Sequence, residues 1–112
     1  MPRFARFSQK PYLVLITAGS RLEAGKIAKT LLSKKLAACV SLLSGVDSLF
    51  RWKGKIDRAR EFQLIIKTDK RFLKPIEKVV RGLHSYEVPE IIGWPIAWGS
   101  RAYLDWISES LA

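Results

Sequence analysis

The chain opens with a strand-like run of apolar residues followed by a helix-like one. Residues 12–18 (YLVLITA) form a nearly continuous apolar run rich in β-forming side chains, typical of a strand covered on both faces. Gly19-Ser20 ends this run, and Ser20 with Glu23 three positions later matches a capping box. Apolar residues then recur at helical spacing as far as Leu36. The sequence therefore predicts a strand and then a helix.

The next segment has the pattern of a long hairpin. Residues 38–52 are β-like, and Ser44-Gly45 within them indicates a bulge or bend. Lys53-Gly54-Lys55 matches a hairpin tip, because glycine supplies the positive φ of a tight turn. In 61–68 (EFQLIIKT) apolar and polar residues alternate, which predicts a return strand with one buried and one polar face. We expect this hairpin to reach past the body of the domain.

A second helix and a final strand follow. Apolar residues at helical spacing in 69–84 predict a helix that begins near Lys74, with Pro75 in its first turn. Residues 88–97 (VPEIIGWPIA) predict a strand, and its two prolines favour an edge, a bend or a bulge. Gly99-Ser100 opens a last helix, whose predicted inner face consists of Tyr103, Leu104, Ile107 and Leu111.

The order β-α-β-β-α-β with an added C-terminal helix predicts an α+β, ferredoxin-like fold. Two right-handed split βαβ units give an antiparallel four-stranded sheet with helices on one face. The other face would carry large apolar groups, and this favours oligomerisation. We expect residues 11–112 to form one domain and residues 1–10 (MPRFARFSQK) to be a basic tail rather than a signal peptide.

Composition indicates where in the cell the protein is expected and whether it spans a membrane. The single Cys39 rules out an internal disulfide and favours a reducing, cytoplasmic location. The longest stretch without Asp, Glu, Lys or Arg, residues 36–46, is well short of the about 20 apolar residues of a membrane span, so no membrane partner is expected. The net charge is +10, from 20 basic and 10 acidic residues.

This charge raises the alternative of a small basic nucleic-acid-binding module. The basic residues of the first helix, however, are spaced like an ordinary solvated face, and neither an RNP motif nor a helix-turn-helix signature is present. The four tryptophans favour an interface between protein subunits over base stacking. We therefore expect no nucleic-acid partner.

Four strings give the chain a specific resemblance: 35–56 (KLAACVSLLSGVDSLFRWKGKI), 61–68 (EFQLIIKT), 83–92 (LHSYEVPEII) and 103–107 (YLDWI). In this order they resemble the CutA family of divalent-cation tolerance proteins. The resemblance implies a homotrimer similar in shape to the PII proteins, with hairpin strands paired across subunits. It also implies an association with copper and other divalent cations, without a required cofactor or an established catalytic activity.

The only histidine, His84, is the candidate metal ligand that the resemblance implies, since imidazole binds copper and zinc. Two further ligand positions of some family members hold Leu83 and Ile16 here, which weakens a metal site in one chain. A structural role for His84, ending the helix and fixing the next turn, is the favoured alternative. Cys39 has apolar neighbours and is expected to pack as a small hydrophobe.

A further set of polar and amphipathic residues from the matching strings forms either a ligand cleft or an intersubunit network. Glu61 and Lys67 lie six positions apart on one strand face, about 20 Å from each other, and cannot pair within a chain. The set comprises Trp52, Glu61, Lys67, Tyr86 and Glu90, and Glu87 is a further polar member of the matching strings. With one His, one Cys and no nucleophile elbow, no hydrolytic site can be assembled, and no enzyme activity is expected.

Overall fold

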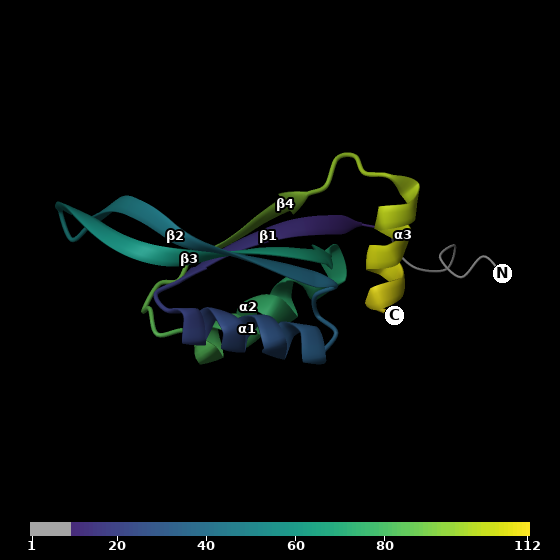
Figure 1. Ribbon diagram of the computed structural model, residues 1–112, viewed down its shortest axis with the longest axis horizontal. Coiled ribbons are helices and arrows are strands. Elements are labelled where there is room, and N and C mark those ends of the chain that lie inside the picture. The colour runs from purple at the N-terminus through teal and green to yellow at the C-terminus, as the bar shows by residue number, and fades with distance from the viewer. Residues whose placement is uncertain (1–9) are drawn as a thin grey trace.

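The structure, a computed structural model, describes residues 10–112, so most of the predicted basic tail lies outside the described residues. The elements follow the predicted order along the chain (Figure 1). They are β1 (Pro11–Ala18), α1 (Arg21–Ser33), β2 (Cys39–Trp52), β3 (Lys55–Asp69), the short 3-10 helix η1 (Lys70–Phe72), α2 (Leu73–Leu83), β4 (Ile91–Pro95) and α3 (Arg101–Ser110). None of these helices is long and apolar enough to cross a membrane.

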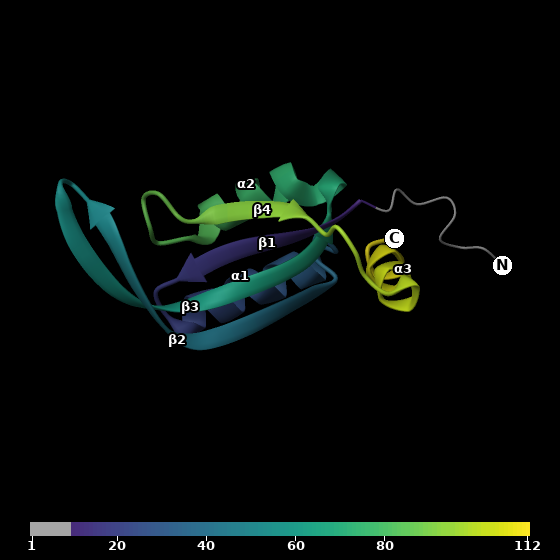
Figure 2. The same cartoon turned by 90° about the horizontal axis from the view of Figure 1, so that it is seen from above.

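The four strands form one antiparallel sheet in the order β2-β3-β1-β4. Helices α1 and α2 lie together beneath one face of this sheet, and α3 stands at the end opposite the hairpin tip (Figures 1 and 2). The predicted α+β, ferredoxin-like arrangement with an added C-terminal helix is thus confirmed. As predicted, β4 lies at an edge, and it spans only five residues, the last of which, Pro95, still pairs with Tyr12.

Local capping explains where the helices begin. The Ser20 hydroxyl accepts a hydrogen bond from the backbone N–H of Glu23 at 3.2 Å, and Ser100 caps α3 in the same way. Asp69 caps η1 by accepting from the N–H of Arg71 at 3.0 Å. Pro75 falls in the first turn of α2, where its missing N–H leaves no helical bond unmade. The chain thus enters each helix at the predicted place.

The hairpin of β2 and β3 extends well beyond the rest of the sheet and gives the molecule an elongated outline (Figures 1 and 2). Its two-residue turn has φ of 50° at Lys53 and 80° at Gly54, as a type I′ turn requires. The ladder shifts register between Leu43 and Val46, where Gly45 has φ of 71°. Both the predicted tip and the predicted bulge are confirmed.

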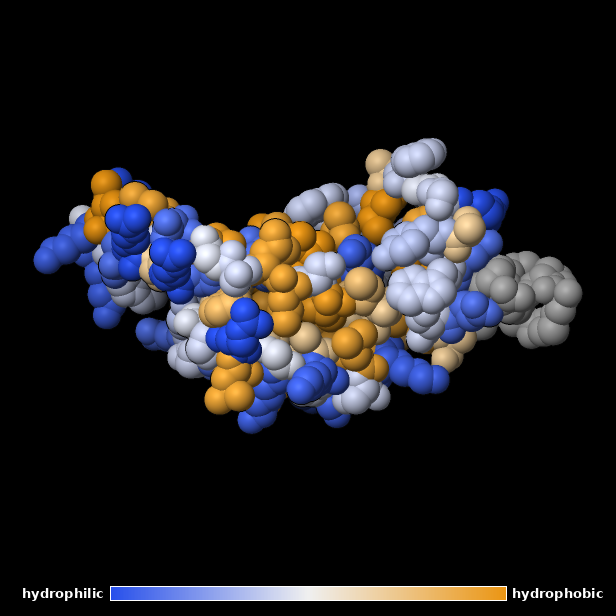
Figure 3. Space-filling view, viewed as in Figure 1, coloured by the Kyte–Doolittle hydropathy of each residue, from blue (hydrophilic) through white to orange (hydrophobic). Residues whose placement is uncertain are grey.

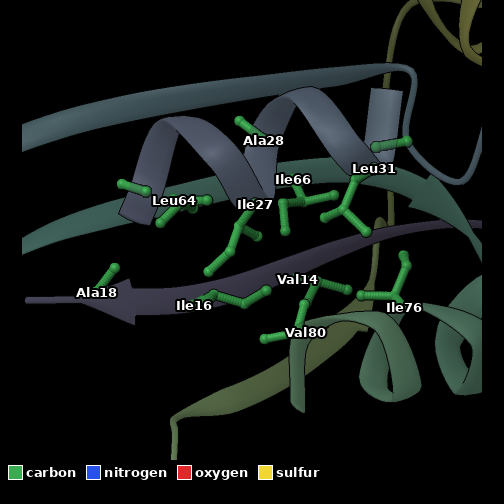
Figure 4. Packing of buried hydrophobic residues seen from close by; sticks show 12 residues of the cluster. Val14, Ile16, Ala18, Ile27, Ala28, Leu31, Leu64, Ile66, Ile76 and Val80 are labelled. Atoms are coloured by element: carbon green, nitrogen blue, oxygen red, sulfur yellow. The ribbon is translucent and has the colours of Figure 1, made fainter. Parts of the chain in front are cut away.

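The core lies between the sheet and the two helices on its covered face. Ile27 and Leu31 of α1 and Ile76 and Val80 of α2 point toward the strands (Figure 4). They meet side chains of β1 and β3 that are almost fully buried: Val14, Ile16, Leu64 and Ile66. This single apolar layer holds the helices against the sheet.

The other face of the sheet, here called the open face, carries no helix. Alternate residues of β1, Leu13 and Leu15, are only half-buried there, so the prediction that this strand is covered on both faces is wrong for the single chain. Ile92 and Trp94 of β4 are exposed on the same face. Figure 3 shows apolar side chains gathered at the centre of the molecule and a largely hydrophilic hairpin.

Helix α3 differs in part from its predicted inner face. Ile107 and Leu111 are buried as expected, and Leu104 is half-buried. Tyr103 is exposed and lies beside Trp106, with ring centroids 5.5 Å apart. The helix touches only the end of the sheet (Figure 1), and Tyr103 is the one residue of its predicted inner face that stays exposed.

Candidate functional site

A groove of about 860 Å³ separates the inner side of the hairpin from the segment 86–90 that leads into β4. Four of the residues singled out from the sequence line it: Trp52, Glu61, Tyr86 and Glu90. They come from β2, from β3 and from the loop between α2 and β4, so only the folded chain brings them together. Thr17 at the end of β1 completes the floor.

Glu61 is anchored in this groove by Tyr86. The Tyr86 hydroxyl donates a hydrogen bond of 2.9 Å to Glu61 Oε2, and Glu61 is only 6% exposed. The sequence predicts that Glu61 and Lys67 cannot pair within one chain, and in the structure the partner of Glu61 is Tyr86, whose hydroxyl lies close to Gly19. A side chain at Gly19 would press against the Tyr86 ring, since a Cβ there would lie 3.1 Å from the hydroxyl.

The same surroundings change the acidity of Tyr86. Burial, followed by the hydrogen bond to Glu61 and the negative charge of that carboxylate, raises the pKa of Tyr86 to about 12. The phenol therefore stays protonated and continues to donate to Glu61 far above neutral pH. The two residues form a fixed polar floor rather than a pair that exchanges a proton near neutrality.

His84 lies directly behind this floor, with a completely buried side chain. Its Nδ1 accepts a hydrogen bond from the backbone N–H of Tyr86 at 3.0 Å, and its Nε2 lies 2.6 Å from the carbonyl oxygen of Thr17. Since Nδ1 accepts, the proton of the neutral ring resides on Nε2 and is donated to Thr17. His84 ends α2 and fixes the turn that positions Tyr86, as the structural alternative predicted.

Glu23 adds an unexpected charge to this cluster. Its Oε2 lies 3.4 Å from His84 Nδ1 and is buried without a hydrogen-bond partner. In a full capping box the glutamate would reach back to the N–H of Ser20. Here the carboxylate is directed to the histidine instead, so the sequence motif identified the cap of α1 but not the second contact that ties α1 to the groove.

The groove is strongly acidic. Among residues 10–112, five Asp and Glu side chains line it, against a single basic side chain, that of Arg58. The guanidinium of Arg58 lies 3.8 Å from Asp47 and offsets part of this charge. We call this cavity the acid groove, and its carboxylates belong to Asp47, Asp57, Glu61, Glu87 and Glu90.

Two members of the acid groove, Asp47 and Asp57, were not singled out from the sequence. The position of Asp57 opposite Phe50 was predictable, because the two-residue turn fixes the hairpin register. Counting back from Lys53-Gly54 pairs Trp52 with Lys55 and therefore Phe50 with Asp57. The approach of segment 86–90 to the hairpin is a tertiary contact, and no local pattern reports it.

Lys67 does not belong to the acid groove. Its Nζ lies 3.3 Å from Ser41 Oγ and 3.8 Å from Cys39 Sγ, on neighbouring positions of β2. Cys39 is half-buried there. The structure therefore divides the predicted set: Trp52, Tyr86 and Glu90 join Glu61 at one end of the sheet, whereas Lys67 lies six positions along β3 toward α2.

The acid groove offers oxygen ligands and aromatic walls, which suit a cation or a positively charged small molecule. Hard divalent cations prefer carboxylates, whereas copper prefers imidazole nitrogen and thiolate sulfur. Within residues 10–112 no three His, Cys, Asp or Glu side chains converge closely enough to hold a metal ion. Both nitrogens of His84 already have partners, so metal ligation by this residue stays a prediction that requires one bond to be released.

Comparison with known proteins places these features in a family. The family model described as CutA1 divalent ion tolerance protein matches residues 12–110. The divalent-cation tolerance proteins CutA of Thermus thermophilus and Archaeoglobus fulgidus are 43% and 45% identical over 98 residues, covering 88% of this chain and 95% of each relative. A chloroplastic CutA protein of Arabidopsis thaliana is 40% identical over 88% of this chain and 54% of its own length.

Solved structures agree with this assignment. The structure named as the periplasmic divalent cation tolerance protein CutA of Archaeoglobus fulgidus superposes with a TM-score of 0.88 at 43% identity, covering 91% of this chain and 99% of the other. The Thermus thermophilus protein gives 0.87 at 42% identity, with coverage of 89% and 97%. Since these names mention a chloroplast and a periplasm, a cytoplasmic location for this chain stays a prediction. The chain belongs to the CutA1 divalent ion tolerance family.

Proposed function

We propose that this protein acts in divalent-cation tolerance as a homotrimer in the cytoplasm, binding a divalent cation such as copper, or a small ligand, in clefts between subunits. The proposal contains no catalytic step. The observation that carries it is the acid groove, where five carboxylates gather on a chain of net charge +10. A cation must overcome the overall positive field, so its binding depends on a local concentration of ligands.

The open face supports an assembly of several copies. Large apolar side chains stay exposed on it, including Leu43, Ile92 and Trp94. The sheet also ends in two unpaired edges, β2 and β4, and an unpaired edge can add a strand from another chain. A second copy covering this face would remove apolar surface from water and complete the backbone hydrogen bonds of the edges.

The acid groove suits a cleft between subunits because exposed side chains line it on both sides. Trp52 and Phe50 form an exposed aromatic wall, and Glu87 and Glu90 stand exposed on the opposite side. A neighbouring copy would narrow this opening and could add its own ligands. The groove would then hold a cation with groups from more than one chain, with His84 as the predicted nitrogen ligand beneath it.

Calorimetric titration with Cu²⁺ and with Zn²⁺ tests the metal part of the proposal. Glu87→Gln/Glu90→Gln removes two exposed carboxylates from the groove and leaves the Glu61–Tyr86 floor in place. We expect this double variant to bind at least about tenfold more weakly, since each lost charge-assisted ligand costs about 1 kcal/mol or more. The control Glu77→Gln/Glu109→Gln changes the net charge equally outside the groove and should bind like the parent.

The variant His84→Gln tests whether His84 is a nitrogen ligand of the metal. If copper affinity is unchanged in this variant while the groove variant is impaired, His84 is not a ligand. If the parent binds neither metal, direct binding is excluded. Light scattering tests the trimer separately: we expect three times the chain mass of 12.7 kDa, and a single-chain mass would contradict the assembly.

A further inference from the structure

The outer surface of α1 and α2 collects a large share of the positive charge of the chain. The buried residues of α1, among them Ala24, Ile27 and Leu31, place Lys26 and Lys29 on the side turned away from the sheet. In α2, Ile76 and Val80 are buried against the sheet, so three exposed basic residues lie on the side of this helix turned away from the sheet. We call this surface the basic helical face; its members are Lys26, Lys29, Lys74, Lys78 and Arg81.

These charges are largely uncompensated. Arg81 has a weak partner in Glu77, with 3.8 Å between the charged atoms. Within the described part of the chain, no carboxylate lies within ion-pair distance of Lys26, Lys29, Lys74 or Lys78. Half of the chain's carboxylates lie instead in the acid groove, on the hairpin and the segment 86–90. Folding therefore separates the two signs of charge on the surface.

The two helices form one continuous surface. They lie side by side beneath the sheet in both views (Figures 1 and 2) and share the core that they cover. Packed helices are about 8–10 Å apart, and successive outward residues on each are about 5–6 Å apart along the axis. Ammonium and guanidinium groups thus recur about once per turn along both helices, and the surface offers several positive charges to one polyanion.

We propose that the basic helical face binds the phosphate backbone of a nucleic-acid duplex without reading its bases. Lysines and an arginine on a rigid surface supply phosphate contacts, which position a duplex but carry no sequence information. The face has no inserted helix or loop that could enter a groove to reach base edges. Binding is therefore electrostatic, sequence-independent and steeply dependent on salt.

The chemistry of the face favours a duplex over other polyanions. Neither α1 nor α2 contains an aromatic residue, so unpaired bases find no stacking platform. An anionic membrane attracts helices that also insert apolar side chains. Here the apolar stripes of both helices are used by the core, and Leu22, 84% exposed near the start of α1, is the prominent exception.

The arrangement of the two helices changes the expectation drawn from the sequence. One helix with spaced lysines looked like a solvated face, and no nucleic-acid motif was present. The tertiary structure adds a second basic helix alongside the first and moves the compensating carboxylates elsewhere. The inference depends neither on metal binding nor on the number of subunits, so it can fail or succeed independently of the proposed function.

The test is fluorescence anisotropy of a labelled DNA duplex of mixed sequence, titrated with the full chain at several salt concentrations. We expect binding at low salt, with a logarithmic affinity that falls linearly with the logarithm of salt concentration. Lys26→Glu/Lys78→Glu should reduce low-salt affinity by at least about tenfold and lower the magnitude of the salt slope by about two, because each lysine accounts for about one phosphate contact. Light scattering and circular dichroism check that the assembly and fold are unchanged.

Two charge-matched controls locate the surface. Arg51→Glu/Lys55→Glu changes the hairpin tip, and Arg3→Glu/Arg6→Glu changes the N-terminal segment, each by the same total charge. Both should keep the salt slope of the parent. The proposal is overturned if all three doubles weaken binding equally, if the N-terminal double alone abolishes it, or if the parent does not bind the duplex at low salt. Binding to anionic lipid vesicles but not to the duplex would also overturn it.

Discussion

The two halves of β3 have the same strand geometry but opposite surroundings. Residues 55–60 belong to the overhanging hairpin and are almost entirely exposed, whereas alternate residues of 61–69 are buried in the core. Ile56 is 73% exposed and Ile66 is fully buried. Both halves pair with β2, and only the second half also pairs with β1 and is covered by helices.

This difference shows that the hairpin and the body are stabilised in different ways. The body is held by apolar burial between sheet and helices, which is the dominant favourable term in folding. Outside the body, the hairpin has only its cross-strand pairs, and an isolated two-stranded hairpin is marginally stable in water. A second copy of the chain is the cover that its exposed apolar residues predict, consistent with the proposed trimer.

The largest expected contrast comes from shortening the isoleucine in each half. Ile66→Ala should lower the free energy of unfolding by about 2–5 kcal/mol, because it leaves a cavity in a closely packed core. In the separated chain, Ile56→Ala should change it by no more than about 0.5 kcal/mol. Urea unfolding at low protein concentration, where dissociation is favoured, measures both.

The effect of Ile56→Ala on stability should also depend on protein concentration. If a neighbouring copy covers Ile56, the stability of Ile56→Ala relative to the parent should decrease as concentration rises, because the parent gains more from assembly. An equal effect of the two substitutions at low concentration would contradict the division between hairpin and body.

The next effect concerns Tyr86, whose bond to Glu61 lies where the two halves meet. Tyr86→Phe leaves a buried carboxylate without its donor and should cost about 1–3 kcal/mol. Burial and Glu61 raise the pKa of Tyr86 from 10.0 to about 12, so folding favours the protonated phenol. Its contribution is complete below about pH 10 and is lost as the pH rises from about 10 to about 12.

Urea unfolding of the parent and of Tyr86→Phe between pH 8 and pH 12 measures this prediction. The difference in stability between the parent and Tyr86→Phe should be constant up to about pH 10 and shrink above it. A difference that grows in the alkaline range would show that Glu61 is not held by the neutral phenol.

The smallest expected changes in stability come from glycine substitutions, and they should have opposite signs in the body and in the hairpin. Gly25 lies within α1 with no atom near the position of an added Cβ, so Gly25→Ala should stabilise the body by about 0.5–1 kcal/mol. Gly54 has φ of 80° at the hairpin tip, and Gly54→Ala should destabilise by about 1 kcal/mol. Thermal unfolding of both variants under one condition measures the pair, and the same sign for both would contradict these backbone roles.

Most of the fold could be predicted from the sequence because its signals are local. Ser20 capping α1, Pro75 in the first turn of α2 and the Lys53-Gly54 turn each depend on residues a few positions apart. The errors arise where burial depends on distant segments. Tyr103 was assigned to an inner face because of its spacing alone, although α3 touches only the end of the sheet.

The candidate site was predictable only as a set of residues. The family resemblance singled out Trp52, Glu61, Tyr86 and Glu90, and the structure brings these four together. It also grouped Lys67 with them, although alternation along a strand fixes a shared face and not a shared location. Asp47 and Asp57 of the acid groove were missed because nothing in their local pattern shows that segment 86–90 approaches the hairpin.

By itself, the sequence determined the order of the elements, their caps and turns, the family and the net charge of +10. Short-range backbone and side-chain preferences encode these features directly. Only the tertiary structure decided that Tyr86 holds Glu61, that His84 is bonded through both nitrogens and that opposite charges occupy different surfaces. Those outcomes depend on which distant segments the apolar core draws together, and the core is formed by long-range packing rather than by any local motif.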